Sequence, residues 1–104
     1  MKNIMLICAA GMSTSLMVTK MRKAAEEKNL EADIFAISAS EFDETVAQKD
    51  IDVVLLGPQV KFMKNQFTPV LSKKNIPIDV INMQYYGMMN GEKVLDQALK
   101  LLEI

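Results

Sequence analysis

The residues with the clearest capacity for chemistry stand together near the N-terminus, in the segment Cys8-Ala9-Ala10-Gly11-Met12-Ser13-Thr14-Ser15. Cys8 is the only cysteine of the chain, and small residues and three hydroxyl side chains follow it. A thiolate is a strong nucleophile, and a loop of small residues lets several backbone N–H groups turn toward one centre. The segment therefore indicates a nucleophile beside a site for an anion with several acceptor oxygens.

An inert role for Cys8 is the main alternative, because free cysteines are commonly buried as small apolar side chains. The context favours the reactive role. Cys8 ends an apolar run, Gly11 permits backbone conformations that a side chain resists, and a helical pattern follows. The N–H groups at a helix N-terminus stabilise both a thiolate and a bound anion. We therefore predict a reactive or anion-binding role for Cys8.

Two absences restrict the chemistry of the chain. It has no histidine, which excludes a Cys–His dyad, a Ser–His pair and a His-ligated metal site within it. Its single cysteine cannot form an internal disulfide, and nothing indicates an oxidising compartment. The net charge is −1, from 12 basic and 13 acidic residues, which argues against nucleic-acid binding and a polybasic membrane patch. We expect no metal and no cofactor.

The N-terminus loosely imitates a signal peptide, because Lys2 precedes the apolar run Ile4-Met5-Leu6-Ile7. That run breaks at Gly11 and Ser13, so it is shorter than the usual apolar region of a signal peptide. The chain also contains no run of about 18 apolar residues that would suggest a transmembrane segment. We expect a cytoplasmic protein with no direct membrane insertion.

The elements that must position Cys8 follow from the hydrophobic pattern. Apolar runs predict four strands, at residues 3–8, 32–38, 52–56 and 76–81. The segments between these strands have apolar residues at helical spacing. Met17, Met21, Ala24 and Ala25 form one stripe of a helix that Asn29 is expected to end.

The later helices are predicted from their caps. Ser40 with Asp43 resembles a weak capping box for a short helix through Ala47. Residues 60–71 have helical spacing, which Pro69 is expected to divide, with Thr68 capping the second part. Asn90 is expected to cap a final helix with an apolar face.

This alternation predicts an α/β fold: a single doubly wound, four-stranded parallel sheet with helices on both faces, in one domain over residues 1–104. In such sheets a ligand binds beyond the carboxyl ends of the strands, near the switch point. The candidate loops are therefore residues 8–15, 38–40, 57–60 and 82–91.

Three motifs give the chain a specific resemblance. They are the strand and loop at residues 4–15, then Leu55-Leu56-Gly57-Pro58-Gln59-Val60, and finally Tyr86-Gly87-Met88-Met89-Asn90-Gly91. With these motifs in this order, the whole chain resembles a IIB component of the bacterial sugar phosphotransferase system, of the lactose/cellobiose/chitobiose class. The first motif is the most specific of the three.

The resemblance implies a phosphorelay, in which the chain is a protein-phosphohistidine–sugar phosphotransferase. A phosphohistidine on a IIA partner would phosphorylate Cys8, and phosphocysteine would then phosphorylate a sugar held by a membrane IIC permease. Cys8 would be the catalytic nucleophile. The phosphate would be bound by residues 9–15, namely Ala9, Ala10, Gly11, Met12, Ser13, Thr14 and Ser15. The expected sugar is a disaccharide similar to cellobiose or chitobiose, and the expected state is a monomer.

Two other functions stay open. Low-molecular-weight tyrosine phosphatases and arsenate reductases also place a cysteine loop after the first strand. The phosphatase loop needs an arginine six residues after its cysteine, where this chain has Thr14, and its only arginine is Arg22. A resolving cysteine for a redox role is absent. A module in which phosphocysteine regulates a partner is the second alternative.

Residues at the edge of the predicted site offer contacts for phosphate or for a partner protein. Gln59 follows the third strand, and its alternative role is simply to begin the next helix. The other candidates belong to an apolar segment that we expect to be a loop: Tyr85, Tyr86, Met88 and Met89. Methionines in a loop are suited to an adaptable contact surface.

Overall fold

The computed structural model describes residues 1–9 and 12–102, and within this part the side chains of Met12 and Ser13 are not described. The described residues contain four strands: β1 (Lys2–Cys8), β2 (Ala32–Ser38), β3 (Val53–Leu56) and β4 (Ile78–Val80). They form one sheet in the order β2-β1-β3-β4, and every pair is parallel. The predicted parallel sheet is confirmed, although β4 is shorter than residues 76–81.

The two inner strands are buried on both faces. Ile4, Met5, Leu6 and Ile7 of β1 are all 0% exposed, and so are the four residues of β3. Continuous apolar runs of this kind belong to strands that have helices on both sides. This burial explains why the sequence of β1 carries no alternation of polar and apolar residues.

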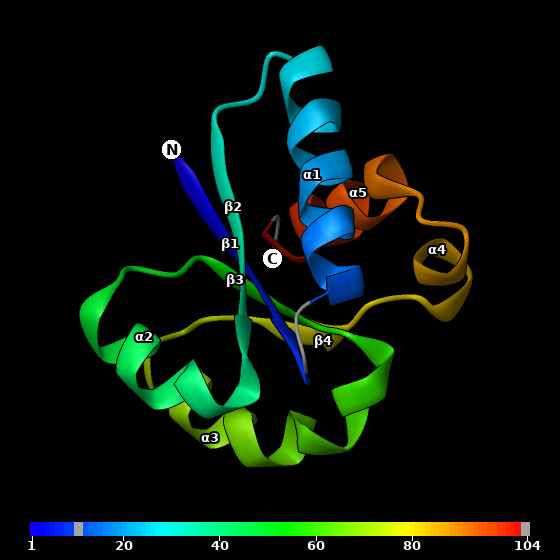
Figure 1. The fold of residues 1–104 in the computed structure, drawn as a ribbon. Coiled ribbons are helices and arrows are strands. Elements are labelled where there is room, and N and C mark those ends of the chain that lie inside the picture. The colour runs from blue at the N-terminus through cyan, green and yellow to red at the C-terminus, as the bar shows by residue number, and fades with distance from the viewer. Residues whose placement is uncertain (10–11, 103–104) are drawn as a thin grey trace.

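Helices cover both faces of the sheet, as Figure 1 shows. One face carries α1 (Met12–Glu27) and α5 (Gly91–Leu102), and the other carries α2 (Phe42–Gln48) and α3 (Lys64–Lys73). The remaining helical elements are α4 (Met83–Gly87) and two 3₁₀ helices, η1 (Ala39–Glu41) and η2 (Pro58–Met63). The doubly wound α/β fold is thereby confirmed. None of the helices in the described part has the length and apolar character needed to cross a membrane.

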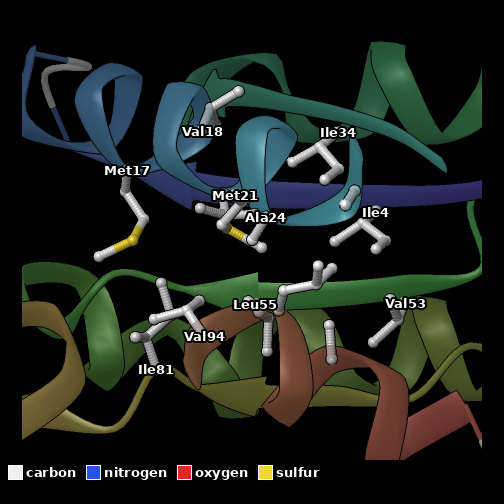
Figure 2. Close-up of a cluster of buried hydrophobic side chains, with 14 of the residues drawn as sticks. Ile4, Met17, Val18, Met21, Ala24, Ile34, Val53, Leu55, Ile81 and Val94 are labelled. Atoms are coloured by element: carbon white, nitrogen blue, oxygen red, sulfur yellow. The ribbon is translucent and has the colours of Figure 1, made fainter. Parts of the chain in front are cut away.

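The core on the α1 side contains the stripe predicted from helical spacing. Met17 and Met21 are fully buried there, with Ala24 and Ala25 beside them. Figure 2 shows Met17, Met21 and Ala24 directed from α1 into the cluster that contains Leu55 of β3 and Val94 of α5. Since α5 adds Val94, Leu95 and Ala98 to the same cluster, α1 and the sheet are fixed relative to each other.

The second core, on the α2 and α3 side, is built around two aromatic rings. Phe42 of α2 and Phe67 of α3 stack with ring centroids 4.0 Å apart. They pack on the odd-numbered residues of β1, Met5 and Ile7, together with Val54 and Leu56 of β3. Successive strand residues therefore serve opposite cores, as the two-residue period of a strand requires.

Asparagines mark two helix ends, as the sequence predicts. Asn29 follows α1 with φ 54, in the left-handed region that asparagine tolerates better than most residues. Asn90 precedes α5, and its Oδ1 accepts a hydrogen bond from the backbone N–H of Lys93 at 3.1 Å. Both predictions are confirmed.

The expected division of a helix at Pro69 is wrong, because α3 continues through that proline. The carbonyl that loses its helical partner there belongs to Asn65, which is exposed, so water can replace the missing bond. Thr68 is not a cap, since its hydroxyl donates to the carbonyl of Lys64 within the same helix at 2.6 Å. The change in helix type instead lies between η2 and α3, at Met63 and Lys64.

Two further differences concern helix caps. The capping pair after β2 is Ser38 and Glu41, not Ser40 and Asp43. The segment at residues 85–89 is expected to be a loop, but residues 85–87 belong to α4, which begins where Asn82 Oδ1 accepts from the backbone N–H groups of Gln84 and Tyr85 at 2.9 and 3.2 Å. Both differences arise from local caps that the apolar pattern does not indicate.

The contact between α1 and α5 gives a test of this packing. An ideal Cβ on Gly91 would lie 2.5 Å from the backbone carbon of Lys20, whereas one on Gly87 meets nothing within 4 Å. We predict that Gly91→Ala lowers the free energy of unfolding by about 1–3 kcal/mol, through overpacking. Gly87→Ala, the matched control, should leave it within about 0.5 kcal/mol. Urea unfolding measures both, and equal effects of the two substitutions would contradict the close contact.

Candidate functional site

Cys8 is the last residue of β1, and it is buried, with 4% of the residue exposed. Its S–H group donates to the carbonyl oxygen of Ile37 in β2, with 3.5 Å between sulfur and oxygen. The chain leaves β1 toward β2 on one side, and β3 lies on the other side, so Cys8 stands at the switch point of the sheet. Ligands of open parallel sheets bind at this place.

The predicted loops converge at this edge of the sheet. The backbone N–H of Gly57, directly after β3, donates to the carbonyl of Ile7 at 2.8 Å. One strand further along, Ile81 donates to Leu56 at 2.9 Å. Ser38 is the register partner of Cys8 across β1 and β2. The segments that follow all four strands therefore begin at the same edge as Cys8.

Thr14, in the first turn of α1, has a hydroxyl that is buried without a partner. The residue is 0% exposed, and within the described part of the chain its Oγ1 makes no hydrogen bond. A Cβ added to Gly57 would lie 3.8 Å from this oxygen and 3.2 Å from Oε1 of Gln59. Thr14 and Gln59 thus approach the same glycine, beside the strand end that carries Cys8. A buried hydroxyl without a partner is unfavourable, and a ligand oxygen can relieve it.

The other residues predicted to bind phosphate are placed as follows. Ala9 is exposed and directly follows β1. Ala10 and Gly11 lie outside the described residues, and Met12 and Ser13 are described only as the start of α1. Ser15 is exposed, and its carbonyl accepts from the hydroxyl of Thr19 at 3.2 Å. Phosphate binding by these residues stays a prediction.

The electrostatic surroundings of Cys8 differ on its two sides. The first turn of α1 contains no acidic side chain, so nothing there offsets the partial positive charge of the helix N-terminus. On the β2 side, the Glu41 carboxylate accepts from the N–H of Ser38 at 3.0 Å and from its hydroxyl at 2.9 Å. The backbone N–H and then the hydroxyl of Ser38 hold the pKa of Glu41 below its usual range.

Glu41 was not among the residues predicted for the site. The signal is present in the sequence, because Ser38 and Glu41 have the spacing of a capping box at the end of a predicted strand. Its relevance depends on the register that pairs Ser38 with Cys8 across two strands. That register is a tertiary feature, and the local sequence of either strand does not contain it.

The candidates for the site edge separate into two groups. Tyr86 belongs to the α1-side core and is 9% exposed, and the partly buried Tyr85 and Met89 pack against the same cluster. These three residues therefore stabilise α4 against the sheet and offer little surface to a partner. Met88 is 74% exposed and Gln59 is exposed, so these two remain candidates for contact.

Comparisons with known proteins agree with this arrangement. A family model described as "PTS system, Lactose/Cellobiose specific IIB subunit" matches residues 3–97. The galactose-specific EIIB component of Lactococcus lactis subsp. cremoris is 50% identical over 104 residues, which cover 97% of this chain and 96% of that protein. The oligo-beta-mannoside-specific EIIB component of Bacillus subtilis is 42% identical over 102 residues, or 98% and 97% of the two chains.

A solved structure supports the same relationship. The solution structure of the cellobiose-specific phosphotransferase IIB component from Borrelia burgdorferi superposes with a TM-score of 0.77 at 45% identity, covering 98% of this chain and 92% of that one. The fold and the match over most of the chain define a component of a sugar phosphotransferase system. The chain belongs to the lactose/cellobiose-specific IIB family.

The buried hydroxyl of Thr14 gives a test of the site in its unliganded state. We predict that Thr14→Val raises the free energy of unfolding by about 1 kcal/mol, because it removes a buried polar group that has no partner. Thr19→Val is the control on the same helix, where an exposed hydroxyl is lost, and it should change the value by about 0.5 kcal/mol or less. Urea unfolding measures both. A clear loss of stability in Thr14→Val would show that the hydroxyl is hydrogen-bonded in solution.

Proposed function

We propose that this chain is the phosphoryl carrier of its system, in which Cys8 takes a phosphoryl group from a IIA phosphohistidine and passes it to a sugar. The observation that carries the proposal is the position of Cys8, at the switch point of the sheet and shortly before α1, which begins at Met12. Membership of the IIB family supports a transferase role and implies IIA and IIC partners.

Each transfer breaks one bond and forms one bond. In the first, the Cys8 thiol gives its proton to water, its sulfur attacks phosphorus, an S–P bond forms, and the P–N bond of phosphohistidine breaks. The electron pair of that bond stays on the imidazole nitrogen. In the second, a sugar hydroxyl oxygen attacks phosphorus and loses its proton, and the S–P electron pair returns to the Cys8 sulfur. Phosphoryl transfer of this kind depends mainly on position and on stabilisation of the charged oxygens.

The described residues supply part of that stabilisation. The backbone N–H groups at the start of α1 have no partners inside the helix, and they lie next to the end of β1. The Thr14 hydroxyl is buried and unbonded, so it can donate to a phosphoryl oxygen once Cys8 is phosphorylated. Donors without a fixed positive charge suit a carrier, because the phosphoryl group must also leave.

Hydrolysis of phosphate esters is less well supported. The arginine that a phosphatase loop uses as a bidentate clamp is replaced by Thr14, whose side chain has no charge. Arg22, the only arginine of the chain, is held elsewhere, since its Nε donates to the carbonyl of Ile34 at 2.8 Å. Ile34 lies in β2 four register positions before Ser38, on the side of the sheet away from the carboxyl edge.

The sugar is proposed from the names of the relatives. These are specific for galactose, oligo-beta-mannoside and cellobiose, although their sequences are 42–50% identical to this chain. Such variety suggests that the IIC permease recognises the sugar and that the IIB chain does not. We propose a cellobiose-like or chitobiose-like disaccharide as the substrate held by IIC, and a monomeric carrier that acts in the cytoplasm.

The docking surface is proposed from exposed apolar side chains on segments that follow the strands. Leu16 lies in α1 after β1, Phe62 in η2 after β3, and Met83 and Met88 at α4 after β4. Their exposed fractions are 49%, 76%, 66% and 74%. Large exposed apolar residues at one edge are typical of protein contact sites. We propose that IIA and IIC approach Cys8 over these side chains.

Intact mass spectrometry tests the carrier function directly. The protein is incubated with phosphoenolpyruvate, the two general relay proteins and a matching IIA. We predict one added phosphoryl group on the wild type and none on Cys8→Ser or in samples without IIA. Failure to add the group with several IIA partners, together with hydrolysis of aryl phosphates by the isolated chain, would contradict the carrier function and support a phosphatase.

Met88 tests the docking surface. We predict that Met88→Ser raises the IIA concentration at half-maximal phosphorylation rate about fivefold, because a single exposed contact contributes about 1 kcal/mol. Urea unfolding should be unchanged, since Met88 is 74% exposed. Val70→Ser is the control, because Val70 is an exposed apolar residue of α3, beside the other core. Equal rates for wild type and Met88→Ser would remove Met88 from the docking surface.

A further inference from the structure

The end of β2 forms one side of the Cys8 site. Cys8 and Ser38 are register partners in adjacent parallel strands, so their side chains leave the sheet on the same face. The thiol also leans toward β2, since it donates to the carbonyl of Ile37. A side chain that is hydrogen-bonded to Ser38 therefore lies on the same side of the sheet as a phosphoryl group on Cys8.

Hydrogen bonds around Ser38 have a defined direction. The Glu41 carboxylate can only accept, so the Ser38 hydroxyl donates to it at 2.9 Å. That leaves only lone pairs on Ser38 Oγ, and the Ser40 hydroxyl must then be the donor in the contact between the two serines at 3.0 Å. In this series of hydrogen bonds, the Ser40 hydroxyl donates to the Ser38 hydroxyl, which donates to the Glu41 carboxylate. The β2 side thus presents acceptors and negative charge to Cys8.

Among the helical segments that directly follow the four strands, only those after β2 have acidic side chains in the first turn. The first turns of α1, η2 and α4 contain no acidic side chain. Glu41 lies in η1, and Asp43 and Glu44 follow in the first turn of α2. Of these three acids, Glu41 is the one that the structure bonds to the register partner of Cys8.

We propose that Glu41, held by Ser38, is a positioning residue that raises the tendency of phosphocysteine to give up its phosphoryl group. The inference rests on the proposed carrier function of Cys8. A phosphorylated side chain carries close to two negative charges at neutral pH, which is more negative charge than the sulfur can carry without the phosphoryl group. Glu41 therefore repels the phosphorylated state more strongly than the resting state.

The repulsion disfavours the phosphorylated state of Cys8 in both steps of the relay. It shifts the equilibrium with IIA toward phosphohistidine and favours release to the sugar. Donors at the N-terminus of α1 act in the opposite sense, so the two sides of Cys8 together set the transfer tendency. Glu41 is exposed, and an exposed charge is screened by salt, with a screening length of about 10 Å at 0.1 M. A charge effect should therefore weaken as salt is added.

The test is the equilibrium distribution of the phosphoryl group between IIA and this chain, measured by intact mass spectrometry at low and at high ionic strength. We expect Glu41→Gln to increase the phosphorylated fraction of this chain relative to IIA about two- to fivefold at low salt. The difference should shrink toward unity at about 1 M salt, where the screening length is about 3 Å. Ser38→Ala should shift the equilibrium in the same direction, because it removes one of the two bonds that hold the carboxylate.

Two further variants separate charge from structure. Glu41→Asp keeps the charge and should stay closer to the wild type than Glu41→Gln. Glu27→Gln makes the same chemical change at the far end of α1 and should leave the distribution unchanged. An effect of Glu41→Gln that is equally large at high salt would indicate a structural role and overturn the proposal.

The outcome also distinguishes this proposal from the carrier function. If the wild type takes no phosphoryl group from IIA, the carrier function itself fails. If the wild type is phosphorylated and Glu41→Gln gives the same distribution at low salt, only the role of Glu41 is overturned.

Discussion

Parallel pairing of β1 with β2 on one side and β3 on the other determines where every functional group of this protein can lie. Because β1 is the first strand and also an inner strand, its carboxyl end faces the point where the chain order of the sheet reverses. Cys8 occupies that end, with α1 beginning shortly after it. Residues of β1 pack into both hydrophobic cores, one on each face of the sheet. The position of Cys8 at the end of β1 is therefore fixed by the packing of both cores.

The groups around Cys8 then belong to the segments that follow β1 and its neighbouring strands. From α1 come the backbone N–H groups of its N-terminal turn and the buried Thr14 hydroxyl, which on the proposed function favour a phosphoryl group on Cys8. From β2 come the Ile37 carbonyl and the Ser38–Glu41 pair, which we propose to disfavour it. A phosphoryl carrier of the kind proposed has to accept a group and release it within one cycle. Opposed influences on the two sides of one sulfur provide a physical means of keeping both steps feasible.

The sequence predicts those features that depend on short stretches of chain. The bounds of β2 and the cap at Asn90 agree with the structure, because short apolar runs and side-chain capping are local features of the sequence. Helix α4 was missed because Tyr85 and its apolar neighbours suggest a loop unless Asn82 is noticed as a cap. The proposed role of Glu41 could not be predicted, because it depends on the register between two strands about 30 residues apart along the chain. Identifying Cys8 required both its local context and the resemblance to a family.

The most direct test of the account is a comparison of ¹H–¹⁵N NMR spectra of the protein before and after phosphorylation through IIA. If the phosphoryl group is bound by Cys8 and the start of α1, the largest amide shifts will fall on residues 9–15. Smaller shifts are expected at Gly57 and Ser38, which border the site, and none at the opposite edge of the sheet near Asp52 and Pro77. Large shifts at that opposite edge, or a phosphorylated protein whose residues 9–15 do not respond, would contradict the central claim.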